Sequence, residues 1–181
     1  MSSFDYKNCT IEELWKYVAT HLETQEIGIT LVGGGVATIY SKGKYQSGDL
    51  DFVLDSMWTK HSQVEEKLKK IGFLKKGVIY RHPECKFTLE YKSPPIEIGD
   101  DDRIEPEAIE HAGIAIKILT PTDCVKDRLN KYFLYKDQDA FDAAISVAKE
   151  RGFVAEKVEK FCSENKFPQV FKKFMDELKK S

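Results

Sequence analysis

Apolar residues recur at helical spacing near the start of the chain. In residues 11–23 they come every three or four positions, at Ile11, Leu14, Trp15, Val18 and Leu22. Thr10 and Glu13 stand three residues apart directly before this run, which is the arrangement of a capping box at a helix N-terminus. The pattern predicts a first helix over residues 11–23.

Short apolar runs follow, separated by two further helical patterns. Five runs favour strands because they are β-branched or alternate apolar with polar positions: IGITLVG (27–33), DLDFVL (49–54), FLKKGVIYRH (73–82), KFTLEYK (86–92) and IAIKILT (114–120). In KFTLEYK the apolar side chains share one face, and Lys86, Thr88 and Glu90 share the other. Helices are expected directly after Gly35 and in a segment that ends at Gly72.

From Thr120 onward the pattern is helical only. Pro121 suits the first turn of a helix, and Asp123 completes a second capping box with Thr120. Four apolar stripes follow, within residues 125–133, 141–148, 154–162 and 171–178. The predicted fold class is therefore α/β (α+β), with a small mixed sheet flanked by helices in residues 1–119 and a helical subdomain, residues 120–181, packed on that core.

Composition and charge narrow the function classes. The chain of 181 residues carries 28 Lys and Arg against 30 Asp and Glu, a net charge of -2, so any nucleic-acid partner must be met by a local patch. We expect no strong non-specific binding to nucleic acid. The four cysteines are scattered and the start of the chain has no apolar leader, which favours reduced thiols and a cytoplasmic protein. No apolar run is long enough to span a membrane.

Residues 33–51 contain three consecutive glycines and two aspartates that are candidates for ligand binding. Asp49 and Asp51 lie two apart on a predicted strand, so their side chains share a face, and paired carboxylates of this kind suit a divalent cation. Gly33, Gly34 and Gly35 fall between a predicted strand and a predicted helix, where free backbone N–H groups can bind phosphate. Each feature alone also fits a solvated strand end or a tight turn. Together they indicate a nucleoside triphosphate site.

The spacing of these residues resembles the DNA polymerase beta-type nucleotidyltransferase superfamily. Gly34-Gly35 is followed after thirteen residues by Asp49-Leu50-Asp51, and Ser47 stands as in the S-x-D-h-D form common among bacterial members, where h is a hydrophobic residue. The lack of a GKS or GKT after the glycines sets the stretch apart from a Walker P-loop. Within the superfamily, the chain resembles the small bacterial and archaeal branch of abortive-infection toxin-type nucleotidyltransferases.

The resemblance implies roles for residues outside this stretch. Glu90 matches a third acid on a later strand, and TPTDCVKDRLNKY matches a Pro-initiated helix with Asp127 and Arg128 at an acid-base pair. Asp139 and Asp142 match a following acidic helix. By helical periodicity Arg128 falls within an apolar stripe, so it should be paired, either with a triphosphate or in a structural bridge with Asp139.

The activity implied by the resemblance is metal-dependent transfer of an NMP from an NTP to an acceptor hydroxyl. Asp49, Asp51 and Glu90 would be the catalytic and metal-binding residues, with Mg²⁺ or Mn²⁺ as cofactor. Nucleotide binding would fall to Gly34, Gly35, Ser47, Lys42 and Arg128. The resemblance implies an RNA end, a protein side chain or a small molecule as acceptor, and it allows a toxin–antitoxin or defence setting.

Other interpretations stay open at this point. The alternative function is a binding module or antitoxin that keeps the nucleotidyltransferase fold but turns over little. Asp100, Asp101 and Asp102 form a rival acidic run, although such a run after glycine is typical of a solvated turn. The lysines of residues 156–180 can meet RNA, but the acids interleaved with them favour an ordinary solvated face.

Overall fold

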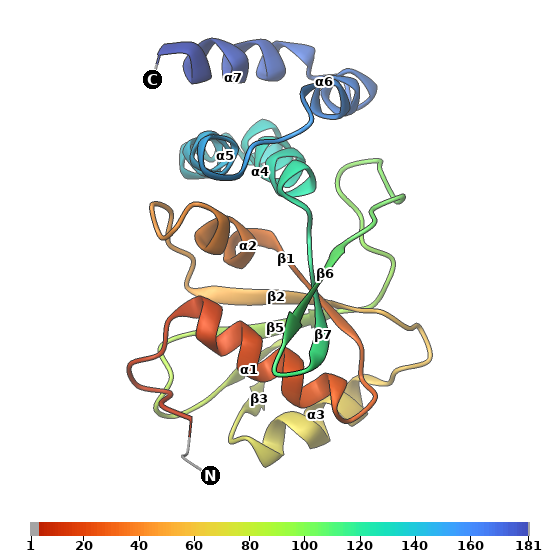
Figure 1. Cartoon of the computed structure of the whole chain (residues 1–181). Helices are drawn as coiled ribbons and strands as arrows, with labels where there is room; N and C mark the ends of the chain where they lie inside the picture. The colour runs from red at the N-terminus through yellow and green to blue at the C-terminus, as the bar shows by residue number, and fades with distance from the viewer. Residues whose placement is uncertain (1–3, 181) are drawn as a thin grey trace. The chain divides into compact units, whose positions relative to one another are not determined.

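The computed structural model describes residues 4–180, which form seven helices and a seven-stranded sheet (Figure 1). These residues divide into two compact units, and neither is continuous in the chain. The first comprises residues 4–35, Ser47–Pro95 and Glu107–Ile118; the second comprises Val36–Gln46, Ile96–Pro106 and residues 119–180. Within residues 4–180, no helix has both the length and the apolar character needed to cross a lipid bilayer.

The first unit is built on the sheet, whose strands lie in the order β3-β4-β5-β2-β1-β7-β6. The strands are β1 (Ile29–Val32), β2 (Asp49–Leu54), β3 (Leu74–Lys76), β4 (Ile79–Arg81), β5 (Thr88–Lys92), β6 (Glu107–His111) and β7 (Ile114–Ile118). The sheet is mixed, because β1 pairs antiparallel with β2 but parallel with β7, and β2 pairs parallel with β5. The small mixed sheet predicted from the sequence is thus confirmed.

Two helices of the first unit, α1 (Ile11–Glu23) and α3 (His61–Lys70), cover its apolar core. The predicted capping box of α1 is present, with Thr10 and Glu13 bonded reciprocally. The apolar face of α1 is fully buried and contacts β1, β2 and β7. Leu50, Phe52 and Leu89 are completely buried, which turns the alternate positions of β2 and β5 toward the opposite face.

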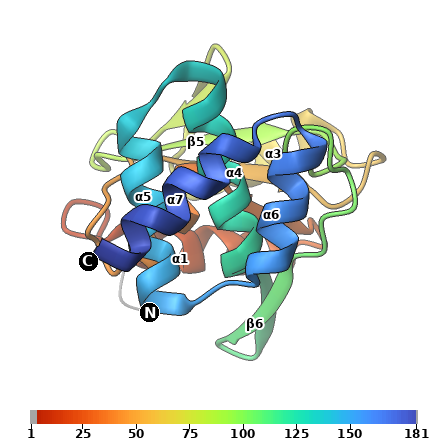
Figure 2. The ribbon, with the colours of Figure 1, turned by 90° about the horizontal axis from the view of Figure 1, so that it is seen from above.

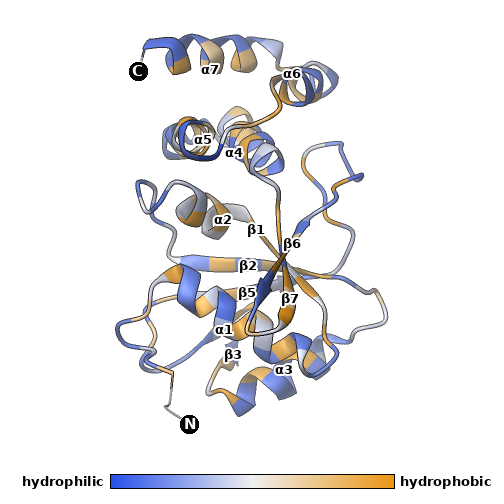
Figure 3. Cartoon of the chain, viewed as in Figure 1, coloured by the Kyte–Doolittle hydropathy of each residue, from blue (hydrophilic) through white to orange (hydrophobic). Residues whose placement is uncertain are grey.

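The second unit contains α4 (Pro121–Tyr135), α5 (Gln138–Arg151), α6 (Ala155–Glu164) and α7 (Pro168–Lys180), the four helices predicted from the apolar stripes. Helices α4 and α5 pack against each other, α6 contacts α4 and α7, and α7 also contacts α4 and α5 (Figure 2). Apolar positions on α6 and α7 alternate with hydrophilic ones (Figure 3), and the buried ones are Val158, Phe161, Cys162, Val170 and Phe174. The unit boundary passes inside α2 (Gly33–Tyr40).

One prediction about the strands was wrong, and one strand was not predicted. FLKKGVIYRH is a hairpin of β3 and β4 rather than one strand, because Gly77 takes a left-handed φ of 67° and the chain turns back on itself. The edge strand β6 was not predicted, since its sequence EAIEH has little apolar character and none of its residues is buried. Its pairing with β7 determines the conformation of this segment.

Candidate functional site

The three predicted acids meet on one face of the sheet. Asp51 of β2 stands directly opposite Glu90 of β5 in the parallel register, and Asp49 stands two residues before Asp51 on the same face. Residues opposite each other in neighbouring strands lie about 5 Å apart. Asp49 is exposed, and Asp51 and Glu90 are half-buried, so solvent reaches all three carboxylates. The register of β2 and β5 therefore places all three carboxylates on the same face of the sheet.

The glycines form the first turn of α2, and this turn lies against β2. Gly33 has a left-handed φ of 72°, and a Cβ placed on it would lie 2.5 Å from Oδ2 of Asp51. A Cβ on Gly35 would lie 2.8 Å from Cδ2 of Leu50 and 3.4 Å from the carbonyl oxygen of Asp49. Sequence reasoning ranked Gly34 and Gly35 above Gly33. The close contact of Gly33 with Asp51 was missed, although the first glycine after a strand is a common place for a left-handed residue.

Asp49 and Glu90 each have a polar neighbour. The Ser47 hydroxyl donates a hydrogen bond of 2.7 Å to Oδ1 of Asp49, and Nζ of Lys92 lies 3.9 Å from Oε1 of Glu90. Within residues 4–180, no three His, Cys, Asp or Glu side chains stand close enough together to hold a metal ion. The donors are nonetheless of the right chemistry, because Mg²⁺ takes oxygen ligands and shares one or two carboxylates with substrate phosphates.

Lys42, a predicted phosphate ligand, belongs to the second unit and forms an ion pair there. Its Nζ lies 2.8 Å from Oε2 of Glu150, and Nζ of Lys44 lies 2.7 Å from Oε1 of the same residue. Hydrogen bonds from Lys42 and Lys44 lower the pKa of Glu150 to about 2. Any phosphate bound by Lys42 has to compete with this carboxylate.

Arg128 is buried on α4, with 4% of its surface exposed, as the helical periodicity predicts. Its partner is the adjacent Asp127, whose Oδ2 accepts hydrogen bonds of 2.6 Å from Nη2 and 3.1 Å from Nε. Burial opposes the charge of Arg128, but the Asp127 carboxylate outweighs it and raises the pKa of the guanidinium. Of the two partners expected from periodicity, a triphosphate or Asp139, the structure shows neither: the carboxylate that binds Arg128 is Asp127, the acid that the resemblance sets beside it.

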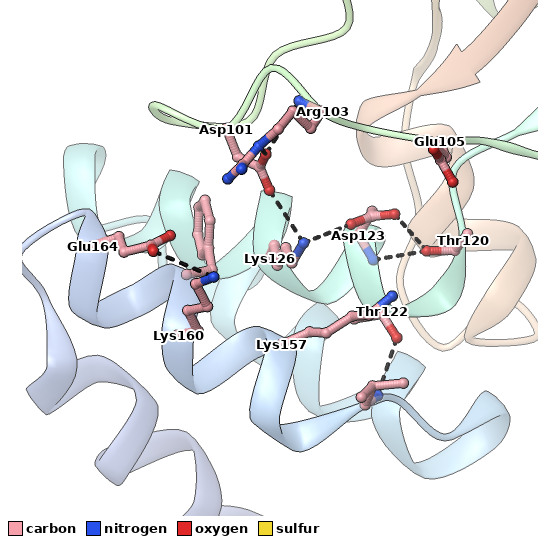
Figure 4. A pocket seen from close by; sticks show the side chains of 12 residues that line it. Asp101, Arg103, Glu105, Thr120, Thr122, Asp123, Lys126, Lys157, Lys160 and Glu164 are labelled. Atoms are coloured by element: carbon pink, nitrogen blue, oxygen red, sulfur yellow. Dashed lines mark hydrogen bonds and ion pairs between the residues drawn. The ribbon is translucent and has the colours of Figure 1, made fainter.

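The rival acidic run of residues 100–102 borders a polar cavity of about 620 Å³ in the second unit (Figure 4). Asp101 is ion-paired with the buried Lys126 at 3.3 Å and with Arg103 at 3.8 Å. Lys126 also contacts Asp123 at 2.9 Å. Burial acts to raise the pKa of Asp101, but the backbone N–H of Arg103 and the Lys126 ammonium lower it overall. The negative charge of Asp101 is thus compensated by Lys126 and Arg103, so Asp101 needs no metal ion to balance it.

Comparison with known proteins identifies the fold. The sequence matches no protein-family profile and no curated protein. The solution structure of the antibiotic-resistance factor ANT(2″)-Ia superimposes with a TM-score of 0.61 at 11% identity, over 86% of this chain and 90% of that one. The crystal structure of ANT(2″)-Ia with adenylyl-2″-tobramycin gives a TM-score of 0.60 at 11% identity, over 86% and 96%.

A third solved structure has the same arrangement. It is an antigenic nucleotidyltransferase-like protein from Paracoccidioides brasiliensis, with a TM-score of 0.56 and 15% identity over 90% of this chain and 92% of that one. At these identities the likeness concerns the fold and leaves the activity to be argued from the residues. The chain has the mixed α/β fold of nucleotidyltransferase-like proteins.

Proposed function

We propose that the chain is a metal-dependent nucleotidyltransferase, which moves an NMP from an NTP to an acceptor hydroxyl. The observation that carries the proposal is the register that sets Asp51 beside Glu90, with Asp49 on the same face and the glycine turn of α2 against Asp51. Carboxylates and a helix N-terminus side by side match the two needs of an NTP, which are a cation and donors for its phosphates. The fold of the solved neighbours agrees with this function.

The carboxylates are the proposed ligands of Mg²⁺ or Mn²⁺. Asp49, Asp51 and Glu90 supply hard oxygen donors, and the NTP phosphates supply others, so that the site is completed when the nucleotide binds. A metal ion bound there would neutralise the charge that develops on the attacking and leaving oxygens. The hydrogen bond from Ser47 fixes one oxygen of Asp49 and leaves the other available for the cation.

Phosphate binding is assigned to the first turn of α2. The positive end of the helix dipole attracts anions, and Gly34 and Gly35 lack side chains that would keep a phosphate away from the helix N-terminus. Ser47, Lys42 and Arg128 are further proposed phosphate ligands. For the last two, the ion pairs with Glu150 and Asp127 are the competing structural roles.

The proposed reaction conserves all atoms of the nucleotide and the acceptor. The acceptor hydroxyl oxygen forms a bond to the α-phosphorus, the bond from that phosphorus to the β-phosphate oxygen breaks, and pyrophosphate leaves. The hydroxyl proton passes to Glu90 or to solvent, since a half-buried carboxylate beside Asp51 can act as a general base.

The acceptor class has two sources of support. One neighbour is a complex of ANT(2″)-Ia with adenylyl-2″-tobramycin, which is consistent with a small-molecule acceptor. The resemblance of the Gly34-Gly35 and Asp49-x-Asp51 motifs adds RNA ends and protein side chains. A toxin–antitoxin or defence setting, and an abortive-infection type of activity, rest on that resemblance alone.

The test is transfer of label from α-labelled NTPs in the presence of Mg²⁺ and cell extract. We expect label in RNA, protein or a small molecule, and a loss of about a hundredfold or more in the Asp51→Asn variant, because a bound metal contributes several kcal/mol to such reactions. Asp102→Asn is the matched control, since Asp102 is an exposed aspartate outside the sheet. Absence of transfer, with biological effect intact in Asp51→Asn, would instead point to a binding module.

A further inference from the structure

The most basic part of this acidic chain lies next to the carboxylates in the sheet. Residues 60–86 hold seven lysines and one arginine against three glutamates, within a chain whose net charge is -2. This segment comprises α3, the β3–β4 hairpin and the approach to β5. Because β4 pairs with β5, the hairpin directly adjoins the strand that carries Glu90.

The register divides the cations of the hairpin between the two faces of the sheet. One row of register partners crosses four strands, from Lys76 of β3 through Ile79 of β4 and Glu90 of β5 to Asp51 of β2. Arg81 likewise stands opposite Thr88, which stands opposite Asp49. Residues opposite one another in paired strands share a face. Lys76 and Arg81 therefore project on the same face of the sheet as the acids.

The neighbouring Lys75 lies on the other face. It stands opposite the buried Tyr80, its Nζ lies 6.0 Å from the centre of that ring, and it pairs with Glu65 of α3 at 3.6 Å. Glu66 likewise pairs with Lys67 and Lys70 on α3. In the described part of the chain, Lys76 and Arg81 have no ion-pair partner, and both are exposed.

Exposed apolar side chains accompany the two cations. Leu74, 55% exposed, is the register partner of Arg81, and the half-buried Ile79 lies between Glu90 and Lys76. We call these four residues, Leu74, Lys76, Ile79 and Arg81, the basic sheet edge. Uncompensated cations interleaved with apolar side chains suit a ligand that carries both phosphates and flat apolar groups.

Distances along the sheet relate this edge to the carboxylates. Neighbouring strands lie about 4.8 Å apart, so Arg81 is about 10 Å from Asp49 and Lys76 is about 14 Å from Asp51, measured between backbones. Stacked nucleotides advance about 3.4 Å each along a strand. A nucleic-acid strand whose last hydroxyl lies at the carboxylates would thus place its third or fourth phosphate at these cations.

We propose that the acceptor is the 3′ end of a single-stranded nucleic acid, held by phosphate contacts to Lys76 and Arg81. The proposal rests on the proposed nucleotidyl transfer and specifies its acceptor class. Phosphate contacts position a strand without reading its bases, so several sequences are accepted. The 3′ hydroxyl is the attacking group, and the product is the same strand one nucleotide longer, with pyrophosphate released.

The test compares two double variants of the full chain that lose the same charge. Lys76→Ala/Arg81→Ala removes the cations of the basic sheet edge. Lys69→Ala/Lys75→Ala removes an exposed lysine of α3 and the lysine on the opposite face of β3. Binding of fluorescent RNA and DNA oligonucleotides with free 3′ hydroxyls is measured by anisotropy at about 50 and about 200 mM KCl.

Losing two phosphate contacts lowers the salt slope for a single strand by about 1.4. When KCl is raised from about 50 to about 200 mM, the affinity of the wild type should therefore fall about sevenfold more than the affinity of Lys76→Ala/Arg81→Ala. The affinity of Lys69→Ala/Lys75→Ala should fall as much as that of the wild type. Label from α-labelled NTP should enter the RNA or the DNA strand, and strands ending in a 3′-deoxynucleotide should take none.

Several results would overturn the acceptor assignment. They are equal slopes for both double variants, no oligonucleotide binding by the wild type, or label that enters a small molecule or a protein instead of the strand. Thermal stabilisation by NTP and Mg²⁺ separates this failure from failure of the proposed function. Both double variants should keep it, whereas its absence in the wild type would count against nucleotidyl transfer itself.

Discussion

Gly33→Ala tests the candidate site with a single added methyl group, because Gly33 lies against the Asp51 carboxylate. Alanine at position 33 would have to keep a φ of 72°, and its Cβ would lie 2.5 Å from Oδ2 and 3.3 Å from Cγ of Asp51. The left-handed conformation costs an alanine about 1–2 kcal/mol more than a glycine. The overlap with Oδ2 is too close to persist, so the Asp51 carboxylate has to turn away.

The expected outcome has a stability part and a functional part. For a chain of this size, 1 kcal/mol corresponds to about 2–4 °C in Tm, so Gly33→Ala should melt about 2–8 °C lower than the wild type. Because Asp51 is displaced, stabilisation by NTP and Mg²⁺ should be lost at temperatures where the variant is fully folded. Differential scanning fluorimetry with and without nucleotide measures both effects.

Gly48→Ala is the matched control. Gly48 precedes Asp49 directly, yet a Cβ placed on it meets nothing within 4 Å. We expect Gly48→Ala to change the free energy of unfolding by no more than about 0.5 kcal/mol, with a correspondingly small change in Tm. Its nucleotide binding should equal that of the wild type. Wild-type Tm and wild-type nucleotide binding in Gly33→Ala would refute the close packing of α2 on the Asp51 carboxylate.

Three further predictions concern groups with shifted pKa values or buried charge. Asp127→Asn leaves the Arg128 cation buried without its partner, so the free energy of unfolding measured in urea should fall by about 3 kcal/mol. A fall below about 1 kcal/mol would show that another anion pairs with Arg128. Burial raises the pKa of the Cys162 thiol from 9.0 to about 12, so the free energy of unfolding should fall as the pH rises above 9. In Cys162→Ala this fall should be less steep by up to about 1.4 kcal/mol per pH unit. Parallel plots of the free energy of unfolding against pH for the variant and the wild type would contradict this prediction. Lys42→Met should raise the pKa of Glu150 from about 2 toward 4.5 in a carboxyl NMR titration, and an unmoved titration would disprove their contact.

Elements with strong local signals were predictable residue by residue. Helix α1 begins and ends where the Thr10 capping box and the apolar spacing place it, and β2 spans the predicted residues 49–54. The alternation in KFTLEYK also predicted correctly which side chains of β5 are buried. In each case local propensity and burial favour the same conformation, so no tertiary information was needed.

Features that depend on pairing with distant residues were not predictable in the same way. The β6 segment becomes a strand only through its hairpin with β7, and its own composition is too polar to signal one. Arg128 was correctly expected to be buried and paired, but periodicity does not specify which neighbouring acid folds onto it. The sign of φ at Gly33 follows from how the chain leaves β1 and enters α2, which three consecutive glycines leave undetermined.

The register of the sheet is the part of the site that sequence could least provide. Alternation places Asp49 and Asp51 on one face, whereas the position of Glu90 opposite Asp51 depends on the parallel pairing of strands almost 40 residues apart. The same pairing brings Lys76 and Arg81 onto the face of the acids and Lys75 onto the other. Neighbouring lysines in the sequence thus acquire different roles.

Binding of Mn²⁺ in the presence of a non-hydrolysable NTP analogue tests the central claim most directly, because Mn²⁺ reports its own coordination by electron paramagnetic resonance. The proposed carboxylate site predicts a protein-bound ternary complex in the wild type and in Asp102→Asn. Asp51→Asn and Glu90→Gln should weaken the complex at least about tenfold, the usual scale for loss of a group that supports a metal. Equal Mn²⁺ affinity in all four proteins, or Mn²⁺ bound only to free nucleotide, would contradict a metal site at Asp49, Asp51 and Glu90.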